Sequence, residues 1–342
     1  MKKLFPLLVL LLLGVLTCTK NPSGPTTPES SLVYVNVYSK ILVIDSSQDK
    51  VVDSIKFDFP IAELNLSADR RILYIQRGYD YCYRNCPDSF VEVNVSSKAI
   101  RYQGENSDLF PTPDGKYIVS TRNGLKIFST FNHQIVYENN LNVTTRPTFD
   151  SQYPLFYVGM ADKRILVFDY QRLQIVKYLE ALRGKQLPPI FDILYSEIDN
   201  KLYFSSYFST NDTPFTSYMG NMDTKRDRLI TIERLDTYEP WGYWGEGYLS
   251  SSKALQKIYL LSSTYGAVIP EFIPYNFMGF SITSRKIVSS LGVYNYFAGF
   301  SGVQIFDDGT KAYIIGMGGY NLYGILIIDL VENKIIGTIP IP

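Results

Sequence analysis

The chain has 342 residues, and its 33 Lys and Arg residues equal its 33 Asp and Glu residues in number, which gives a formal net charge of zero. A protein that binds nucleic acid needs clustered positive charge against the phosphate backbone, so this balance argues against a nucleic-acid partner. The 28 Tyr and 20 Phe residues favour a strand-rich fold, because aromatic side chains suit the pleated surface of a β-sheet.

The first 18 residues have the order of an export signal. Lys2 and Lys3 precede an apolar run from residue 4 to residue 16, which is too short for a comfortable transmembrane helix. The run ends in Val15-Leu-Thr-Cys18, which resembles the lipobox of bacterial lipoproteins, with Thr17 where that motif usually has Gly, Ala or Ser. The resemblance implies that Cys18 is acylated and anchors an exported protein to the bacterial cell envelope, at the outer membrane or the cell surface. The alternative is an ordinary secreted protein with a cysteine in its leader.

Residues 19–31 read TKNPSGPTTPESS and contain none of the large apolar side chains. This composition is typical of an extended, solvated tether. We therefore expect three parts, which are a lipoprotein signal peptide and lipobox at residues 1–18, a flexible tether at 19–31, and a single folded domain at 32–342.

Beyond the leader the only cysteines are Cys82 and Cys86. A pair of cysteines in an exported protein favours a disulfide, and the short loop that it closes suggests a stabilisation of roughly 2 kcal/mol. A metal site is the competing interpretation, but two thiolates need further ligands and the chain has a single histidine. We expect the disulfide and no metal.

An apolar segment of about five residues recurs along the folded domain at an average spacing of about 47 residues. Each copy is followed by a short polar turn and a second apolar run, and every copy after the first is preceded by a further hairpin. A complete unit therefore has four antiparallel strands, named a to d in chain order. Four-stranded units repeated radially predict an all-β fold, a β-propeller of seven blades. The seven copies are residues 41–45, 90–94, 125–129, 165–169, 219–223, 278–282 and 325–329.

The first unit departs from the others. Residues 32–55 supply strands b, c and d but no strand a, so the sequence predicts a first blade that lacks its inner strand. Ser30 and Ser31, or the last four residues, would supply only a poor substitute.

Several repeat segments match a known blade pattern. They are Tyr34-Val-Asn-Val37, Ile44-Asp45, Lys50-Val-Val52, Pro113-Asp-Gly-Lys116, Ile328-Asp329 and Lys334-Ile-Ile-Gly-Thr-Ile339. In these the chain resembles the YVTN type of seven-bladed propeller, which is quinoprotein amine dehydrogenase-like. The resemblance covers nearly all of residues 32–342 and implies the fold, but it implies little about function, because propellers host unrelated activities. No motif for pyrroloquinoline quinone or copper is present, and we expect no cofactor.

The alternation of strands places every long connection on one face of the propeller. In an antiparallel blade the a–b and c–d turns share one face, and the b–c and d–a connections share the other. All the long connections are of the second kind, and long loops on a rigid scaffold commonly bind ligands. They are residues 77–89, 179–191, 207–217, 237–248, 265–276 and 293–302.

These connections are rich in aromatic residues, whose amphipathic rings suit contacts with a protein, a peptide or a glycan. The candidates for ligand binding are Tyr79, Tyr81, Tyr83, Tyr238, Trp241, Tyr243, Trp244 and Tyr248. The alternative is that the rings only pack the loops onto the propeller.

The only histidine, His133, falls in the c–d turn of the third unit, on the face with short turns. We interpret it as a solvated turn residue rather than a catalytic base. Two functions remain. The first is a membrane-anchored binding or scaffold lipoprotein that uses the aromatic face. The second is a carboxylate-dependent hydrolase or lyase with its site on the same face. The near absence of histidine favours the first.

Overall fold

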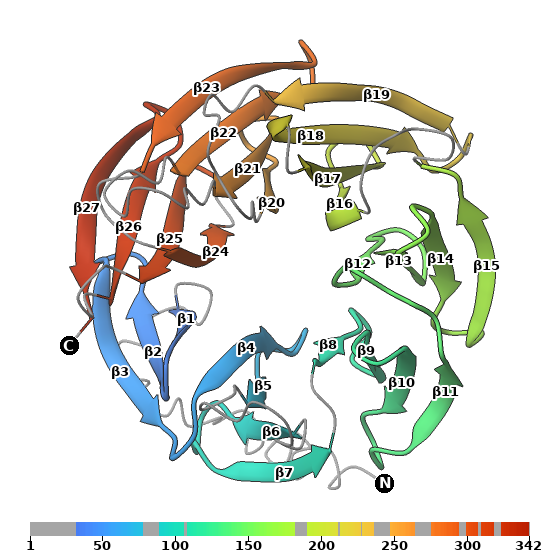
Figure 1. Ribbon diagram of the computed structural model, residues 1–342. Coiled ribbons are helices and arrows are strands. Elements are labelled where there is room, and N and C mark those ends of the chain that lie inside the picture. The colour runs from blue at the N-terminus through green and yellow to red at the C-terminus, as the bar shows by residue number, and fades with distance from the viewer. Residues whose placement is uncertain are drawn as a thin grey trace, which may run out of the picture.

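The computed structural model describes residues 32–77, 89–105, 108–181, 190–210, 213–226, 228–235, 247–263, 275–293, 299–306, 309–317 and 323–341. In these ranges the chain forms 27 β-strands and no helix. The strands make seven antiparallel sheets arranged as blades around a central axis, as Figure 1 shows. The predicted seven-bladed β-propeller is therefore confirmed.

Blade 1 has three strands and the other six blades have four each, ordered by sequence from the axis outward. Blade 1 comprises β1 (Leu32–Val37), β2 (Lys40–Asp45) and β3 (Lys50–Lys56). Blade 2 comprises β4 (Ile61–Leu66), β5 (Ile72–Arg77), β6 (Ser89–Asn94) and β7 (Ile100–Glu105). Blade 3 comprises β8 (Phe110–Pro111), β9 (Tyr117–Ser120), β10 (Leu125–Ser129) and β11 (Ile135–Asn139). Blade 4 comprises β12 (Thr148–Phe149), β13 (Leu155–Gly159), β14 (Ile165–Asp169) and β15 (Gln174–Leu179).

The remaining blades follow the same order. Blade 5 comprises β16 (Ile190–Ser196), β17 (Lys201–Thr210), β18 (Thr213–Asp223) and β19 (Arg228–Leu235). Blade 6 comprises β20 (Gly247–Ser252), β21 (Lys257–Ser263), β22 (Tyr275–Ser281) and β23 (Lys286–Gly292). Blade 7 comprises β24 (Gly299–Ile305), β25 (Lys311–Met317), β26 (Tyr323–Asp329) and β27 (Lys334–Pro340). Within the described residues blade 1 has no inner strand, as its sequence predicted.

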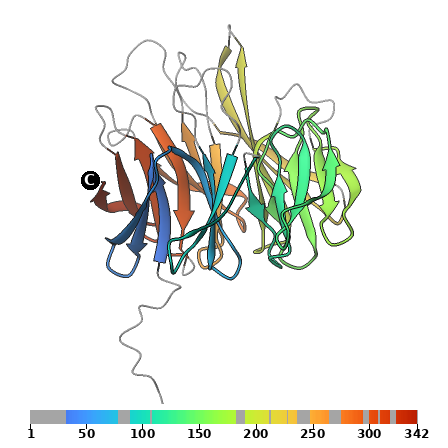
Figure 2. The same cartoon turned by 90° about the horizontal axis from the view of Figure 1, so that it is seen from below.

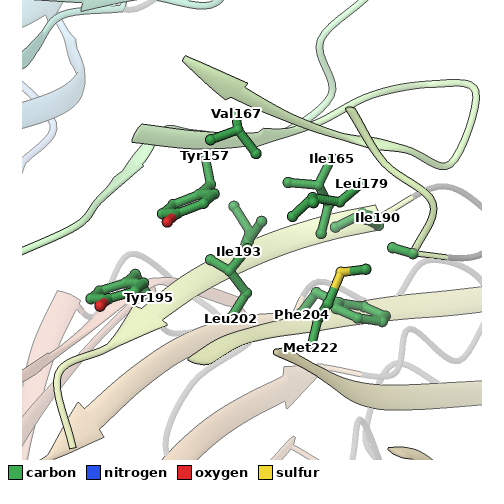
Figure 3. Packing of buried hydrophobic residues seen from close by; sticks show 11 residues of the cluster. Tyr157, Ile165, Val167, Leu179, Ile190, Ile193, Tyr195, Leu202, Phe204 and Met222 are labelled. Carbon is green, nitrogen blue, oxygen red and sulfur yellow. The ribbon is translucent and has the colours of Figure 1, made fainter. Parts of the chain in front are cut away.

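Burial along the strands follows their place in the blade. Every residue of β14, a c strand, is buried, because both faces of the strand pack against neighbouring blades. In β3, a d strand at the outer rim, five of seven residues are exposed. The apolar core therefore lies between the blades. Figure 3 shows one such layer, in which Tyr157 and Ile165 of blade 4 face Ile193 and Phe204 of blade 5.

Side-chain packing between blades 7 and 1 closes the ring. Ile44 of blade 1 belongs to one buried cluster with Ile325 of blade 7. At the turn of blade 1, the ammonium group of Lys311 lies 2.9 Å from Oδ2 of Asp49, and the hydroxyl of Tyr313 donates to the same carboxylate. The two blades are thus joined by an apolar contact, an ion pair and a hydrogen bond.

In all seven blades the pairing of strand c with strand d shifts register by a β-bulge close to the c–d turn. Six described turns carry a non-glycine residue in the left-handed region just before the d strand, namely Asp49, Lys98, His133, Leu173, Arg285 and Asn333. These turns gather on one face of the ring. The β17–β18 hairpin projects from the opposite face (Figure 2). In the part of the chain that the structure describes, no helix has the length and apolarity to cross a membrane.

Candidate binding site at the mouth of the central channel

The inner strands of blades 2 to 7 begin on the face of the long connections. In each of these a–b hairpins one residue closes the turn by pairing with the residue five positions later, as Ser67 does with Ile72. In blades 2, 5, 6 and 7 the residue four positions before the closing residue is paired with the next strand in the same register, so it lies at the same level in these blades. In blades 3 and 4 the residue with this spacing precedes a short inner strand. These six positions, here called the channel ring, are Glu63, Asp108, Arg146, Asp192, Tyr248 and Gly302. Three carboxylates, a guanidinium and a phenol thus occupy five of the six places at one end of the channel, and Gly302 occupies the sixth.

Arg146 connects three members of the ring across the channel. Its Nη1 lies 3.2 Å from Oε1 of Glu63 in blade 2, and its guanidinium carbon lies 5.6 Å from the ring centroid of Tyr248 in blade 6. Its charge also acts on Asp192, whose pKa it lowers against the effect of burial. The Arg146 side chain is 52% exposed, so a ligand at the channel mouth can reach it.

The Asp192 side chain of blade 5 is hydrogen-bonded to the backbone of blade 6, and its carboxyl group can still gain or lose a proton. Its Oδ2 accepts a hydrogen bond of 2.8 Å from the Leu249 amide, and its Oδ1 accepts one from the Ile193 amide. Burial raises the Asp192 pKa to about 6, and the two amides and Arg146 only partly oppose that effect. Asp192 is therefore poised to gain or lose its proton near neutral pH.

Glu63 has acceptor capacity that the protein does not use. Burial raises its pKa, with smaller contributions of the same sign from Asp108 and Asp192, while Arg146 lowers it. Its Oε1 is buried and has no hydrogen-bond partner, because the contact with Arg146 lacks hydrogen-bond geometry. The ion pair with Arg146 offsets part of the cost of burying this oxygen, and a donor group of a ligand would supply the missing hydrogen bond.

Asp108 differs from the other two carboxylates because its oxygens are saturated. Ser120 Oγ and the Arg122 amide donate to Oδ1, while the Thr121 hydroxyl and amide donate to Oδ2, at distances of 2.7 to 3.1 Å. These bonds fix the end of β9 to the start of the inner strand. Asp108 thus builds the scaffold and contributes negative charge to the channel, but it has no capacity left for a ligand.

β-Bulges in two inner strands determine the direction in which the Glu63 and Asp192 side chains point. The pairing of β4 with β5 shifts register between Ile61 and Glu63, and that of β16 with β17 shifts between Ile190 and Asp192. Such bulges redirect the side chain that follows the extra residue. A carboxylate in a largely apolar strand, as at Glu63 of β4 and Asp192 of β16, is the sequence signal that could have indicated this site.

Of the aromatic residues predicted to bind ligand, the structure describes one. Tyr248 is described, and it belongs to the channel ring. The others lie outside the described residues, as do the predicted lipidation site Cys18 and the predicted disulfide pair Cys82 and Cys86. These other aromatic residues are Tyr79, Tyr81, Tyr83, Tyr238, Trp241, Tyr243 and Trp244.

His133 lies in the predicted c–d turn, but the prediction that it is solvated is wrong. Its side chain is 19% exposed, and its Nε2 lies 2.8 Å from Oε1 of the buried Glu92 in blade 2. The imidazole also stacks on Tyr102 with the ring centroids 3.7 Å apart. His133 therefore fastens blade 3 to blade 2, because the inward orientation of the turn places it in the seam between them.

Among the described residues, no group of three or more His, Cys, Asp and Glu side chains is placed to hold a metal ion.

Comparisons with known proteins inform the fold. No family model and no curated protein sequence matches the chain. Among solved structures, Kuenenia stuttgartiensis hydrazine synthase is similar with a TM-score of 0.61 and 14% identity, over 84% of this chain and 88% of that chain. Dihydro-heme d1 dehydrogenase NirN in complex with DHE is similar with a TM-score of 0.55 and 12% identity, over 94% of this chain and 76% of that chain. At these identities the likeness shows a shared propeller fold and no more.

Proposed function

We propose that this chain is a binding protein that holds a polar ligand over the mouth of its central channel. The observation that carries the proposal is the channel ring, in which Glu63, Arg146, Asp192 and Tyr248 come together from four different blades. A site built on rigid strands holds its contacts in fixed geometry. The ring offers acceptors from the carboxylates, donors from the guanidinium and one aromatic ring, which together suit the hydroxyl or amino groups of a glycan, a peptide or a protein surface.

The aromatic connections of the same face extend this proposed site. Trp241, Tyr243 and Trp244 precede β20, the strand that carries Tyr248, by only a few residues. A ring that stacks on a ligand commonly contributes on the order of 1–2 kcal/mol to binding. We therefore propose that these rings surround the ligand whose polar groups enter the channel mouth.

The proposed setting is the bacterial cell envelope. We propose that Cys18 carries acyl chains and that residues 19–31 tether the propeller to the membrane, on the strength of the leader and the lipobox-like segment. Mass spectrometry of the mature N-terminus should find acylated Cys18, whereas an unmodified N-terminus would overturn this part.

The ligand site is tested by screening the full-length protein in detergent against glycan and peptide arrays, followed by calorimetric titration of each hit. Arg146→Gln should weaken binding about ten-fold or more, because it removes a partly exposed donor that spans the ring. Arg172→Gln is the matched control, because Arg172 is a 75% exposed arginine in a c–d turn on the opposite face. Equal affinity of the Arg146 variant and the parent would contradict the proposal.

A second candidate function rests on the pKa of Asp192. A carboxyl group with a pKa of about 6, beside a second carboxyl group whose pKa is also raised, has the character of a general acid. This favours a carboxylate-dependent hydrolase or lyase that uses the same face. Turnover of an array hit that Asp192→Asn abolishes, with binding retained, would establish the enzyme in place of the binding protein.

A further inference from the structure

A groove follows the inner side of β1, where each of the other blades has a fourth strand. It is lined by residues 32–34 of β1, by residues 64–66 of β4 in blade 2, and by residues 304–306 at the end of β24 in blade 7. Its volume is about 250 Å³. Leu64, Leu66 and Phe306 are half-buried there, so the groove has apolar walls that a strand would cover.

The hairpin geometry of blade 1 turns backbone groups toward this groove. The β1–β2 turn consists of Tyr38 and Ser39, and the flanking residues Val37 and Lys40 face each other. In a two-residue hairpin the flanking pair is hydrogen-bonded, and the pattern then alternates along the strand. The amide and carbonyl of Asn36 therefore face away from β2 and toward the inner side. In the described part of the chain no strand pairs with that side of β1.

The sequence that precedes β1 is poorly suited to this place. In blade 2 the inner strand ends at Leu66 and the next strand begins at Ile72, and the same spacing would put an inner strand of blade 1 at about residues 21–26. That stretch includes Pro22 and Pro25, which cannot donate to a strand ladder. It also has no apolar side chain to cover Leu64 and Leu66.

One end of the groove carries a positive charge. A strand antiparallel to β1 would begin at the channel mouth and would end at the a–b turns, beside Arg70. The guanidinium of Arg70 lines the groove and donates a hydrogen bond of 2.8 Å to the Leu32 carbonyl. Charge complementarity therefore favours a strand with an anion, and not a cation, near its C-terminal end.

We propose that this groove binds an extended peptide segment of a partner protein, which completes blade 1 as its fourth strand. The segment pairs antiparallel with β1, and its apolar side chains pack on Leu64, Leu66 and Phe306. Main-chain hydrogen bonds to β1 supply affinity, as in other cases of strand addition, and the charge of Arg70 sets the direction of the peptide. This site is separate from the channel ring and does not depend on its ligand.

The probe is a fluorescent synthetic peptide, Lys-Val-Thr-Val-Thr-Val-Glu, titrated with full-length protein in detergent and followed by anisotropy. The control peptide Glu-Val-Thr-Val-Thr-Val-Lys has the same composition and the opposite charge order. We expect the first peptide to bind at least about ten-fold more tightly. Arg70→Asn should abolish this preference, and Asn tolerates the positive φ of 59° at that position. Arg71→Asn is the matched control, because Arg71 is exposed and does not line the groove.

Hydrogen–deuterium exchange then locates the peptide. Bound peptide should protect residues 32–37, and Asn36→Pro should remove both protection and binding, because proline lacks the donor on the inner side. If Asn36→Pro fails to fold, the exchange data on the parent protein decide. Absence of binding at about 1 mM peptide, or protection elsewhere, would overturn the proposal. It would also be overturned if deletion of residues 19–31 exposed β1, or if dimerisation alone protected β1, since the occupant would then be this chain or a second copy.

Discussion

Asp192 links the stability of the propeller to pH. Folding raises its pKa from 3.8 to about 6, so between these values the native state binds more protons than the unfolded state. The contribution of Asp192 to the free energy of unfolding therefore falls as the pH rises from about 4 to about 6. Asp192→Asn lacks this ionisation, and its amide oxygen can still accept the hydrogen bond from the Leu249 amide.

We expect the free energy of unfolding of Asp192→Asn, relative to the parent, to increase by on the order of 1 kcal/mol between about pH 4 and pH 7. This value is smaller than the full pKa shift represents, because the side chain is partly exposed. Urea unfolding at several pH values measures it. Asp162→Asn is a control of opposite sign, because hydrogen bonds from Arg164 lower the Asp162 pKa. A constant difference between Asp192→Asn and the parent at all pH values would contradict the assignment.

A second prediction concerns the seam between blades 2 and 3. His133→Asn should lower the free energy of unfolding by about 1–3 kcal/mol, because the buried carboxyl group of Glu92 loses its partner and Tyr102 loses its stacked ring. Asn tolerates the positive φ of 58° at this turn, so backbone strain does not account for the loss. Urea unfolding of the single variants and of His133→Asn/Glu92→Gln gives the coupling between the two side chains. Independent, additive effects would show that the contact contributes nothing.

Gly220 shows why the c strand β18 has a glycine in its interior. A Cβ atom at this position of β18 would lie 2.2 Å from Cζ of Phe204, whose ring covers the strand within the core of blade 5. Gly220→Ala should therefore destabilise the protein by about 1–3 kcal/mol, as overpacking of a core commonly does. Gly337→Ala on β27 is the matched control, since its Cβ would come no closer than 3.3 Å to the Ile327 side chain. Thermal unfolding compares them, and equal melting temperatures would contradict this account of Gly220.

The c–d hairpins and the β-bulges differ in how far local sequence can predict them. The c–d hairpins could be placed because their signal is local, a polar turn between two apolar runs, as at Ser46–Lys50. The bulges before Glu63 and Asp192 could not, because a register shift depends on the partner strand and leaves no distinct pattern in one segment. The inward orientation of His133 likewise depends on the neighbouring blade.

The seven blades followed from counting the repeats, and so did the lack of an inner strand that blade 1 shows within the described residues. The channel ring did not, because its members are separated by about 40 residues or more in sequence and meet only when the inner strands surround one axis. Arg146 and Glu63 become partners through this geometry alone. Tyr248 lies on the face that the sequence predicted for it, whereas the charged residues beside it were not predicted, and a binding role for Tyr248 stays a prediction.

Hydrogen–deuterium exchange decides whether ligand binds at the channel ring. The full-length protein should be measured free and saturated with the tightest ligand from the arrays. We predict that the ligand slows exchange in residues 61–66, 190–196 and 247–252, the inner strands that carry Glu63, Asp192 and Tyr248. Slower exchange confined to the c–d turns, such as residues 95–99, 130–134 and 170–173, would place the ligand on the opposite face and contradict the account.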